Sequence, residues 1–279
     1  MTMDQYEKDL PLGKSSDYKD EYEPGLLCPF PRQAKRDEIG VDAGGLPFSG
    51  FDIWNAYELS WLNPLGKPVV AMAEFRFPCD SEFLVESKSF KLYLNSFNQT
   101  RFNGFADVAG VLQRDLSEAC GATIELDLLP LASVSGASMA KLPGECLDAL
   151  EIEIGEYALN AELLSEAAGS GEVVEETLHS HLLKSNCLVT RQPDWASVMI
   201  RYRGPRIDRE ALLRYLVSFR RHSEFHEQCV ERIFVDLKRY CRPEQLTVYA
   251  RYTRRGGLDI NPFRSDFENS LPNWRLVRQ

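Results

Sequence analysis

The feature that most constrains the fold is an order of elements that occurs twice: strand, two helices, strand. In the first half, alternating apolar residues predict strands at 68–77 and 123–129. Apolar residues at helical spacing predict helices between them, at 86–97 and 105–119. The second half predicts strands at 150–158, 185–191 and 197–203, helices at 208–221 and 225–240, and a last strand at 246–252. This order predicts an α+β fold built from tandem modules of similar plan.

Composition divides the chain into four parts. Residues 1–45 are polar and interrupted by Pro and Gly, so we expect an extended arm with little core of its own. Residues 46–130 form a first module, and residues 131–147, rich in Ser, Gly and Ala, form a linker without a sustained period. Residues 148–279 form the second module.

The overall totals exclude several classes of protein. No apolar run approaches the roughly 18 residues of a membrane span, and the polar N-terminus has no signal-peptide core, so we expect a soluble, cytoplasmic protein. The seven cysteines are widely spread and include no Cys-x-x-Cys pair. That distribution favours reduced thiols over a disulfide framework and argues against an iron–sulfur or zinc-ribbon site.

Charge is distributed unevenly along the chain. The net charge is −10, yet from residue 200 onward there are 17 Lys and Arg against 10 Asp and Glu. A basic C-terminal third on an acidic protein favours a local anionic ligand over a nucleic-acid track. A merely solvated, arginine-rich face explains this count equally well.

Cys187 is the most informative single residue. It lies in a short apolar run that Pro193 should end, because proline cannot donate to a sheet ladder, and Asp194 follows directly. A thiol followed by a carboxylate at the end of its strand is typical of a nucleophile with a proton donor. Taken alone, however, the pattern favours a packing role, because free cysteine is among the most buried residue types.

Other residue patterns leave two interpretations open. His222, His226 and Cys229 have a helical spacing that could ligate zinc, but Cys229 also belongs to an apolar stripe. Glu86 and Glu227 stand at helix starts, where a carboxylate either caps the helix or accepts paired N–H donors from a planar heterocycle.

Two clusters of the sequence could hold an anion. Ser87, Lys88 and Lys91 offer a hydroxyl, ammonium groups and a helix N-terminus suited to phosphate, although a solvated helix face also explains them. Arg255 and Gly256 lie in a turn where glycine would let the backbone approach a ligand closely.

With these residues assembled, the sequence closely resembles the long, two-module form of the 7-cyano-7-deazaguanine reductases, the NADPH-dependent nitrile reductases of queuosine biosynthesis. The segments that carry the resemblance run in the family's order across roughly 46–279: Glu86–Arg101, His181–Cys187, Gln192–Trp195, Glu224–Arg232 and Tyr249–Pro262. Several of these matches are eight or more residues long.

The resemblance implies a fold, an assembly and a set of site residues. It implies tandem tunnelling-fold modules, with antiparallel sheets and helices packed outside, that close a barrel on oligomerisation, and a homodimer with its site where modules meet. The implied catalytic residues are Cys187 as nucleophile, Asp194 as proton donor and His226. The implied substrate contacts are Val85, Glu86, Ser87, His226 and Glu227, and the implied NADPH contacts are Ser87, Lys88, Arg255 and Gly256. No metal, nucleic acid or membrane is implied as a partner.

The family's chemistry gives each residue type a reason. A thiolate that attacks a nitrile carbon forms a thioimide, whose C=N bond accepts hydride, and two NADPH reduce it to 7-aminomethyl-7-deazaguanine. Two alternatives stay open: a zinc-dependent pterin-type cyclohydrolase on the same fold that uses His222, His226 and Cys229, and a non-catalytic deazapurine-binding module.

Overall fold

The structure is a computed structural model that describes residues 18–134 and 139–279. The chain forms two compact units, each assembled from three segments. Unit 1 takes its described residues from Met1–Ala43, Asp52–Ala137 and Arg254–Asp259, and unit 2 takes them from Gly44–Phe51, Ser138–Thr253 and Ile260–Gln279. Neither unit is contiguous in sequence, whereas the ranges 46–130 and 148–279 that composition predicts are contiguous.

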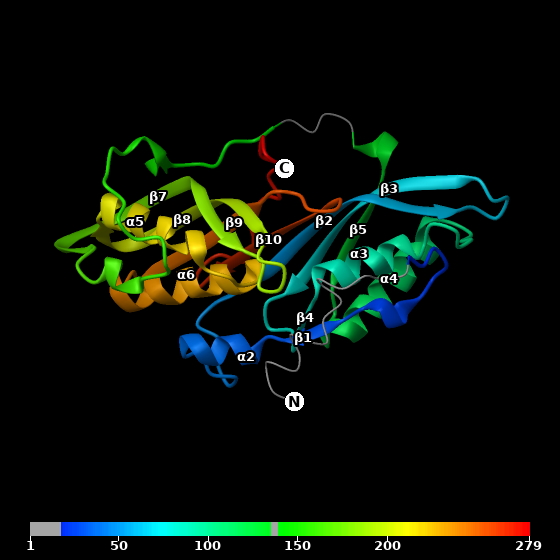
Figure 1. The fold of residues 1–279 in the computed structure, drawn as a ribbon, viewed down its shortest axis with the longest axis horizontal. Helices are drawn as coiled ribbons and strands as arrows, with labels where there is room; N and C mark the ends of the chain where they lie inside the picture. The colour runs from blue at the N-terminus through cyan, green and yellow to red at the C-terminus, as the bar shows by residue number, and fades with distance from the viewer. Residues whose placement is uncertain (1–17, 135–138) are drawn as a thin grey trace. The chain divides into compact units, whose positions relative to one another are not determined.

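Unit 1 is a sheet covered by two helices (Figure 1). Its strands β2 (Ser49–Leu62), β3 (Pro68–Pro78) and β5 (Glu125–Pro130) lie in the order β5-β3-β2, and β3 and β5 pair antiparallel. Helices α3 (Ser87–Asn95) and α4 (Phe105–Cys120) supply the rest of the unit's core. Both strands and both helices predicted here from periodicity are therefore confirmed.

Aromatic side chains join the α3 helix to the sheet of unit 1. The Phe90 ring lies 5.2 Å from the ring of Trp54 and 5.1 Å from that of Phe75, both edge-on. All three side chains are buried. Edge-to-face aromatic pairs contribute beyond the area that they bury, so this cluster fixes the helix that begins at Ser87.

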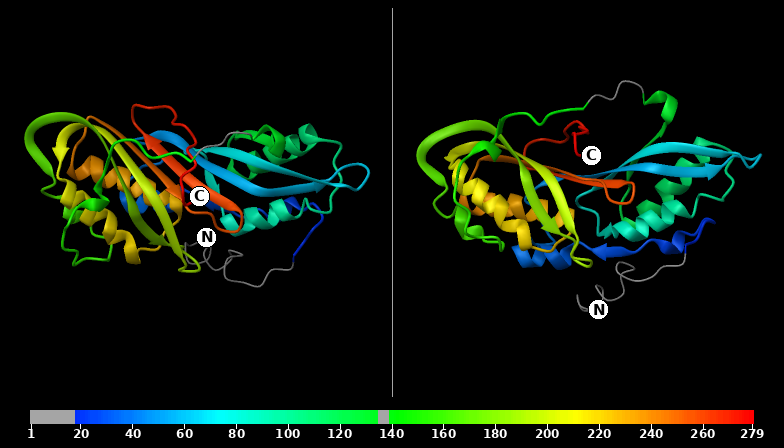
Figure 2. Two further views of the ribbon diagram at one scale, coloured as in Figure 1. Left: turned by 90° about the horizontal axis from the view of Figure 1, so that it is seen from above. Right: turned by 45° about the horizontal axis from the view of Figure 1, so that its top comes forward.

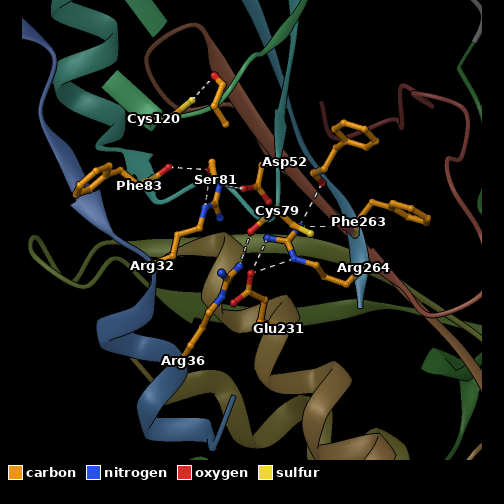
Figure 3. A network of polar contacts seen from close by, with 12 residues as sticks. Arg32, Arg36, Asp52, Cys79, Ser81, Phe83, Cys120, Glu231, Phe263 and Arg264 are labelled. Carbon is orange, nitrogen blue, oxygen red and sulfur yellow. Dashed lines mark hydrogen bonds and ion pairs between the residues drawn. The ribbon is translucent and has the colours of Figure 1, made fainter. Parts of the chain in front are cut away.

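The N-terminal segment is more structured than the extended arm that we expected. From residue 18 on it forms 3-10 helix η1 (Pro24–Leu26), strand β1 (Pro29–Pro31), helix α2 (Gln33–Arg36) and 3-10 helix η2 (Asp37–Ile39). Strand β1 pairs antiparallel with β4 (Phe83–Val85). Arg32 is buried, and its guanidinium donates to Ser81 at 3.0 Å and to Asp52 at 2.6 Å (Figure 3). This buried ion pair, together with buried Phe30, ties the segment down; residues 1–17 lie outside the described residues.

Unit 2 also consists of sheet strands with helices against one face (Figures 1 and 2). Its strands lie in the order β10-β9-β8-β7-β6: β10 (Leu258–Ser265), β9 (Gln245–Tyr252), β8 (Pro193–Ile207), β7 (Ala168–Asn186) and β6 (Glu145–Cys146). The β6–β7 pair is parallel, and the β7–β8, β8–β9 and β9–β10 pairs are antiparallel. Helix α5 (Arg209–Ser218), which continues as 3-10 helix η6 (Phe219–Arg221), and helix α6 (His226–Tyr240) complete the unit.

Both units are therefore α+β and mainly antiparallel. A buried ion pair in unit 2, in which Arg264 donates to Glu231 at 2.9 Å, joins β10 to α6 (Figure 3). Three short 3-10 helices, η3 (Leu131–Ser133), η4 (Leu147–Ala149) and η5 (Ala161–Leu164), lie in the connections. Among the helices of the described ranges, none combines the length and the apolar character needed to cross a bilayer.

Two predictions about strands were wrong, and other strands were missed. Residues 150–158 form no strand: none of these residues is buried, residues 155–158 are all exposed, and β6 takes the place beside β7. The strand predicted at 185–191 ends at Asn186, because the chain turns there into the next strand, which Pro193 opens. The β10 strand, which contains Pro262, was not predicted.

Candidate active site

The thiol of Cys187 lies at the first position of a hairpin loop in unit 2. The last pair of the β7–β8 ladder is Asn186 with Pro193, so residues 187–192 form the loop. Within it, the Cys187 N–H donates to the Gln192 carbonyl at 2.8 Å, and the Arg191 N–H donates to the Cys187 carbonyl at 3.0 Å. These two bonds fix the backbone of Cys187, whose side chain is only 5% exposed.

Asp194 and His226 meet beside this loop. Asp194 is the second residue of β8, opposite Ser185, and is 3% exposed. Its Oδ1 lies 3.3 Å from Nε2 of His226, the first residue of α6. A carboxylate and an imidazole at this distance can share or pass a proton.

The His226 ring is held flat against Tyr252 of β9. The two ring centroids are 3.8 Å apart, and the planes are within 7° of parallel. The ring's second nitrogen, Nδ1, is buried and has no hydrogen-bond partner among the described residues. The pattern of the sequence did not identify Tyr252, because a stacking contact between a strand end and a helix start has no local signal.

Glu227 lies in the first turn of α6 and is buried. The helix dipole favours a carboxylate at this position. The backbone N–H of Phe225, just before the helix, donates to the side-chain oxygen of Gln228 at 3.2 Å. The start of α6 therefore brings His226 and Glu227 to one end of unit 2's helix layer.

A buried polar network ties the end of β7 to the start of α6. The Asn186 N–H donates to the His222 carbonyl at 2.8 Å, and the Glu224 N–H donates to the Asn186 carbonyl at 3.0 Å. The Glu224 carboxylate accepts hydrogen bonds from Arg232 at 2.7 and 3.0 Å and contacts His222 Nε2 at 2.9 Å. Burial by itself would raise the pKa of Glu224, but the contacts with His222 and Arg232 outweigh it and hold this pKa below its usual value.

The alternative zinc set of His222, His226 and Cys229 does not assemble. In the described part of the chain, the donor atoms of these three residues do not gather into a group that could hold a metal ion. Burial raises the pKa of the Cys229 thiol well above its ordinary value, and the nearby Glu224 carboxylate adds to this shift. A thiol that stays protonated is a core residue rather than a metal ligand.

In unit 1, Val85, Glu86, Ser87 and Lys88 stand where β4 runs into α3. Glu86 is the N-cap of the helix: its carboxylate accepts the N–H groups of Lys88 and Ser89, both at 2.7 Å. Burial raises the pKa of Glu86, and these two backbone hydrogen bonds act in the opposite direction. The capping role is thus real; Oε1 also accepts from the Ser87 hydroxyl at 3.4 Å, so the second lone pair that a ligand could use is that of Oε2.

The turn that carries Arg255 and Gly256 lies beside α3 within unit 1. Arg255 and Leu258 exchange backbone hydrogen bonds of 2.8 and 3.2 Å across it. A Cβ added to Gly256, where φ is 59°, would lie 4.0 Å from Cγ of Lys91. Lys91 itself forms an ion pair with Glu58.

The four residues expected to contact NADPH therefore belong to one unit. A lysine, an arginine, a hydroxyl at a helix start and a glycine without a side chain suit the phosphates of a dinucleotide. The structure collects Val85, Glu86, Ser87, Lys88, Arg255 and Gly256 in unit 1, and Cys187, Asp194, His226 and Glu227 in unit 2.

Comparison with known proteins gives matches to two family models and to a solved structure. Residues 18–128 match the family model described as nitrile reductase, 7-cyano-7-deazaguanine-reductase N-term, and residues 193–270 match the one described as QueF-like protein. Among solved structures, the archaeosine synthase QueF-Like in the apo form matches 37% of this chain and all of that chain at 16% identity, with a TM-score of 0.30.

Three curated relatives match over nearly the full length. A protein of Chromobacterium violaceum is 60% identical over 270 residues, which are 96% of this chain and 96% of the relative. Proteins of Azoarcus sp. and Hydrogenovibrio crunogenus are 62% and 56% identical over 96% of this chain and 95% and 96% of their own lengths. All three are named NADPH-dependent 7-cyano-7-deazaguanine reductase. The chain belongs to the family of NADPH-dependent 7-cyano-7-deazaguanine reductases.

Proposed function

We propose that this chain is an oxidoreductase that reduces the nitrile of 7-cyano-7-deazaguanine to the primary amine of 7-aminomethyl-7-deazaguanine, with two NADPH, in queuosine biosynthesis. The observation that carries the proposal is a fixed thiol, Cys187, in a hairpin whose next strand supplies a buried carboxylate in contact with His226. Membership of the reductase family identifies 7-cyano-7-deazaguanine as the substrate and NADPH as the cofactor of this proposal.

Cys187 acts as the nucleophile. Its thiolate adds to the nitrile carbon, so that a C–S bond forms and one C–N π bond breaks, which leaves a covalent thioimide. Asp194 gives a proton to the nitrile nitrogen as the bond forms. NADPH, when bound, supplies hydride to this C=N carbon and again to the imine that remains after the thiolate leaves.

His226 supplies or relays protons in the later steps. Its Nε2 lies 3.3 Å from Oδ1 of Asp194, within reach for returning a proton to that carboxylate after each transfer. Stacking on Tyr252 holds the ring in place. The partnerless Nδ1 is available to a ligand atom, which suits a contact with the substrate.

Glu86 and Glu227 hold the deazaguanine by its N–H edge, with Val85 and Ser87 as further contacts. A carboxylate accepts two parallel N–H donors, which fixes the plane of a heterocycle. Ser87, Lys88, Arg255 and Gly256 hold the NADPH. The full tunnelling-fold barrel forms on oligomerisation, with a homodimer as the expected assembly.

The test is to mix the protein with the nitrile in the absence of NADPH and to measure intact mass. The wild type gains the mass of one substrate molecule, and Cys187→Ala gains none. Cys146→Ser, which removes an exposed thiol elsewhere in unit 2, gains the same mass as wild type. An adduct on Cys187→Ala, or full turnover by that variant, contradicts the proposal.

NADPH oxidation and zinc dependence, measured on the same protein, distinguish nitrile reduction from the two alternative functions. A non-catalytic binding module would oxidise no NADPH when the nitrile is added. A zinc-dependent cyclohydrolase would require stoichiometric zinc for its activity, whereas nitrile reduction does not.

A further inference from the structure

A second group of chemically active side chains lies on the far strands of the unit 2 sheet. It consists of Cys146 on β6 and of His179 and His181 on β7, and the nearest donor atoms of all three lie within 4.8 Å of one another. None of the three has a part in the proposed nitrile reduction. Among the described residues this is the one group of at least three such side chains with metal-binding spacing.

The pairing of strands explains why the three meet. Strand β6 runs parallel to β7, with Cys146 opposite His179. His179 and His181 are two residues apart on β7, and His181 lies in the irregularity between Ser180 and Leu183 of the β7–β8 ladder. The two imidazole rings stand edge to face, with centroids 5.3 Å apart.

Gly144 brings the β6 segment this close to β7. Its φ is 87°, and a Cβ at this position would lie only 2.0 Å from the Thr177 carbonyl oxygen. A side chain would therefore push the segment away from β7. The close approach also places the Pro143 carbonyl 3.1 Å from Nδ1 of His179.

Both imidazoles are oriented through Nδ1, as metal-ligating histidines commonly are. A carbonyl only accepts, so the contact with Pro143 places a proton on Nδ1 of His179 and leaves the lone pair on Nε2. Nδ1 of His181 lies 2.7 Å from the Ser197 hydroxyl, which fixes the second ring.

We propose that Cys146, His179 and His181 form a zinc-binding site with three protein ligands and one position open to water. One thiolate and two imidazole nitrogens are a ligand set that zinc prefers, and three protein ligands leave one tetrahedral position open. Cys146 is exposed, which gives the ion a path to the site. The site is independent of the reductase chemistry.

The test is a zinc titration of the full-length protein after chelator treatment, in competition with a chromophoric zinc indicator. The wild type binds one equivalent of zinc per chain. Replacing a group that only orients a ligand already weakens metal binding by about 10- to 100-fold. Cys146→Ser, His179→Gln and His181→Gln each remove a ligand and therefore weaken binding at least tenfold.

Two matched controls separate this site from other donors in the chain. Cys187→Ser removes the reactive thiol, and His222→Gln removes a histidine of the alternative zinc set; both bind zinc as the wild type does. Cobalt(II) gives a thiolate-to-metal charge-transfer band in the wild type, and Cys146→Ser loses it. Zinc also raises the melting temperature of the wild type and leaves that of folded Cys146→Ser unchanged.

Three results would overturn the proposal: no zinc bound by the stripped wild type, undiminished binding by Cys146→Ser, or equal loss in Cys187→Ser. Nitrile reduction by Cys146→Ser stays at the wild-type rate. A failed adduct test would therefore count against the proposed function and leave the zinc site standing.

Discussion

Arg232 and Glu224 form a buried ion pair between α6 and the segment that precedes it, and we predict that Arg232→Met destabilises the protein strongly. The side chains are 13% and 2% exposed, and two hydrogen bonds of 2.7 and 3.0 Å join them. The substitution leaves the Glu224 carboxylate buried with His222 as its remaining partner. Breaking a buried pair by removal of one member costs about 3–5 kcal/mol.

The matched control is an ion pair of the same type on the surface of unit 2. Arg214 donates to Glu210 at 2.9 Å across one helical turn, with side chains 35% and 55% exposed. Pairs of this kind contribute only about 0.3–0.5 kcal/mol, so Arg214→Met should change stability little. Urea denaturation of both variants, followed by intrinsic fluorescence, gives the two free energies of unfolding.

The pH dependence gives a second signature of the same pair. Because the pKa of Glu224 is lowered in the folded state, its stabilising contribution is present above the unfolded pKa of about 4.3 and is lost as pH falls through the lower folded value. Wild-type stability should therefore decline below about pH 4.3, and Glu224→Gln should remove that part of the decline. Arg232→Met should make this decline in stability smaller, because the contact with Arg232 is one cause of the lowered Glu224 pKa.

Three outcomes would refute this reasoning. The first is an Arg232→Met destabilisation below about 1 kcal/mol, the range of exposed pairs. The second is a double variant, Arg232→Met with Glu224→Gln, that is as unstable as the sum of the single variants, because removing both charges leaves neither one buried alone. The third is an acid-range decline that Glu224→Gln leaves unchanged.

Two further predictions concern the site itself. Asp194→Asn should slow formation of the Cys187 adduct by about 10²- to 10⁴-fold, since an amide gives up no proton to the nitrile nitrogen; an unchanged rate in time-resolved mass measurements would exclude the proton-donor role. Gly257→Ala should destabilise the fold by about 1–3 kcal/mol, because φ is 78° and the new Cβ would lie 2.4 Å from the Glu58 carboxyl carbon. It should also raise the KM for NADPH by distorting its turn. Gly45→Ala, whose Cβ meets nothing within 4 Å, should change neither the free energy of unfolding nor this KM. Denaturation and steady-state assays measure the two quantities.

Helices and strands with one buried face could be predicted from the sequence. Helix α4 was expected at 105–119 and spans Phe105–Cys120, and helix α6 was expected at 225–240 and spans His226–Tyr240. Both have an apolar stripe that packs on their own unit. The segment 150–158 has apolar residues at alternate positions, as a strand with one buried face would, but it has no neighbouring strand. Periodicity does not tell whether a partner strand exists.

The residues that we propose for the reaction could be nominated from the sequence, but the contacts that hold them in place could not. Cys187 and Asp194 are close in sequence, and the resemblance gave them roles. Tyr252 of β9 stacks on His226 at the start of α6, and Arg232 within α6 contacts Glu224 in the segment before that helix. Such contacts depend on tertiary packing, which no local pattern of residue types encodes.

The hairpin that carries Cys187 has a consequence for how this protein can be altered. A side chain in a strand faces the opposite way after a shift of one residue, and proline tolerates no place inside a ladder. Because Pro193 opens β8 opposite Asn186, the backbone pairing fixes how many residues separate the Cys187 thiol from the Asp194 carboxylate. Substitutions at Leu188 or Val189 should therefore be tolerated in evolution or engineering, whereas an insertion or deletion that shifts Asp194 by one place in the β8 ladder should turn its side chain to the opposite face and abolish activity.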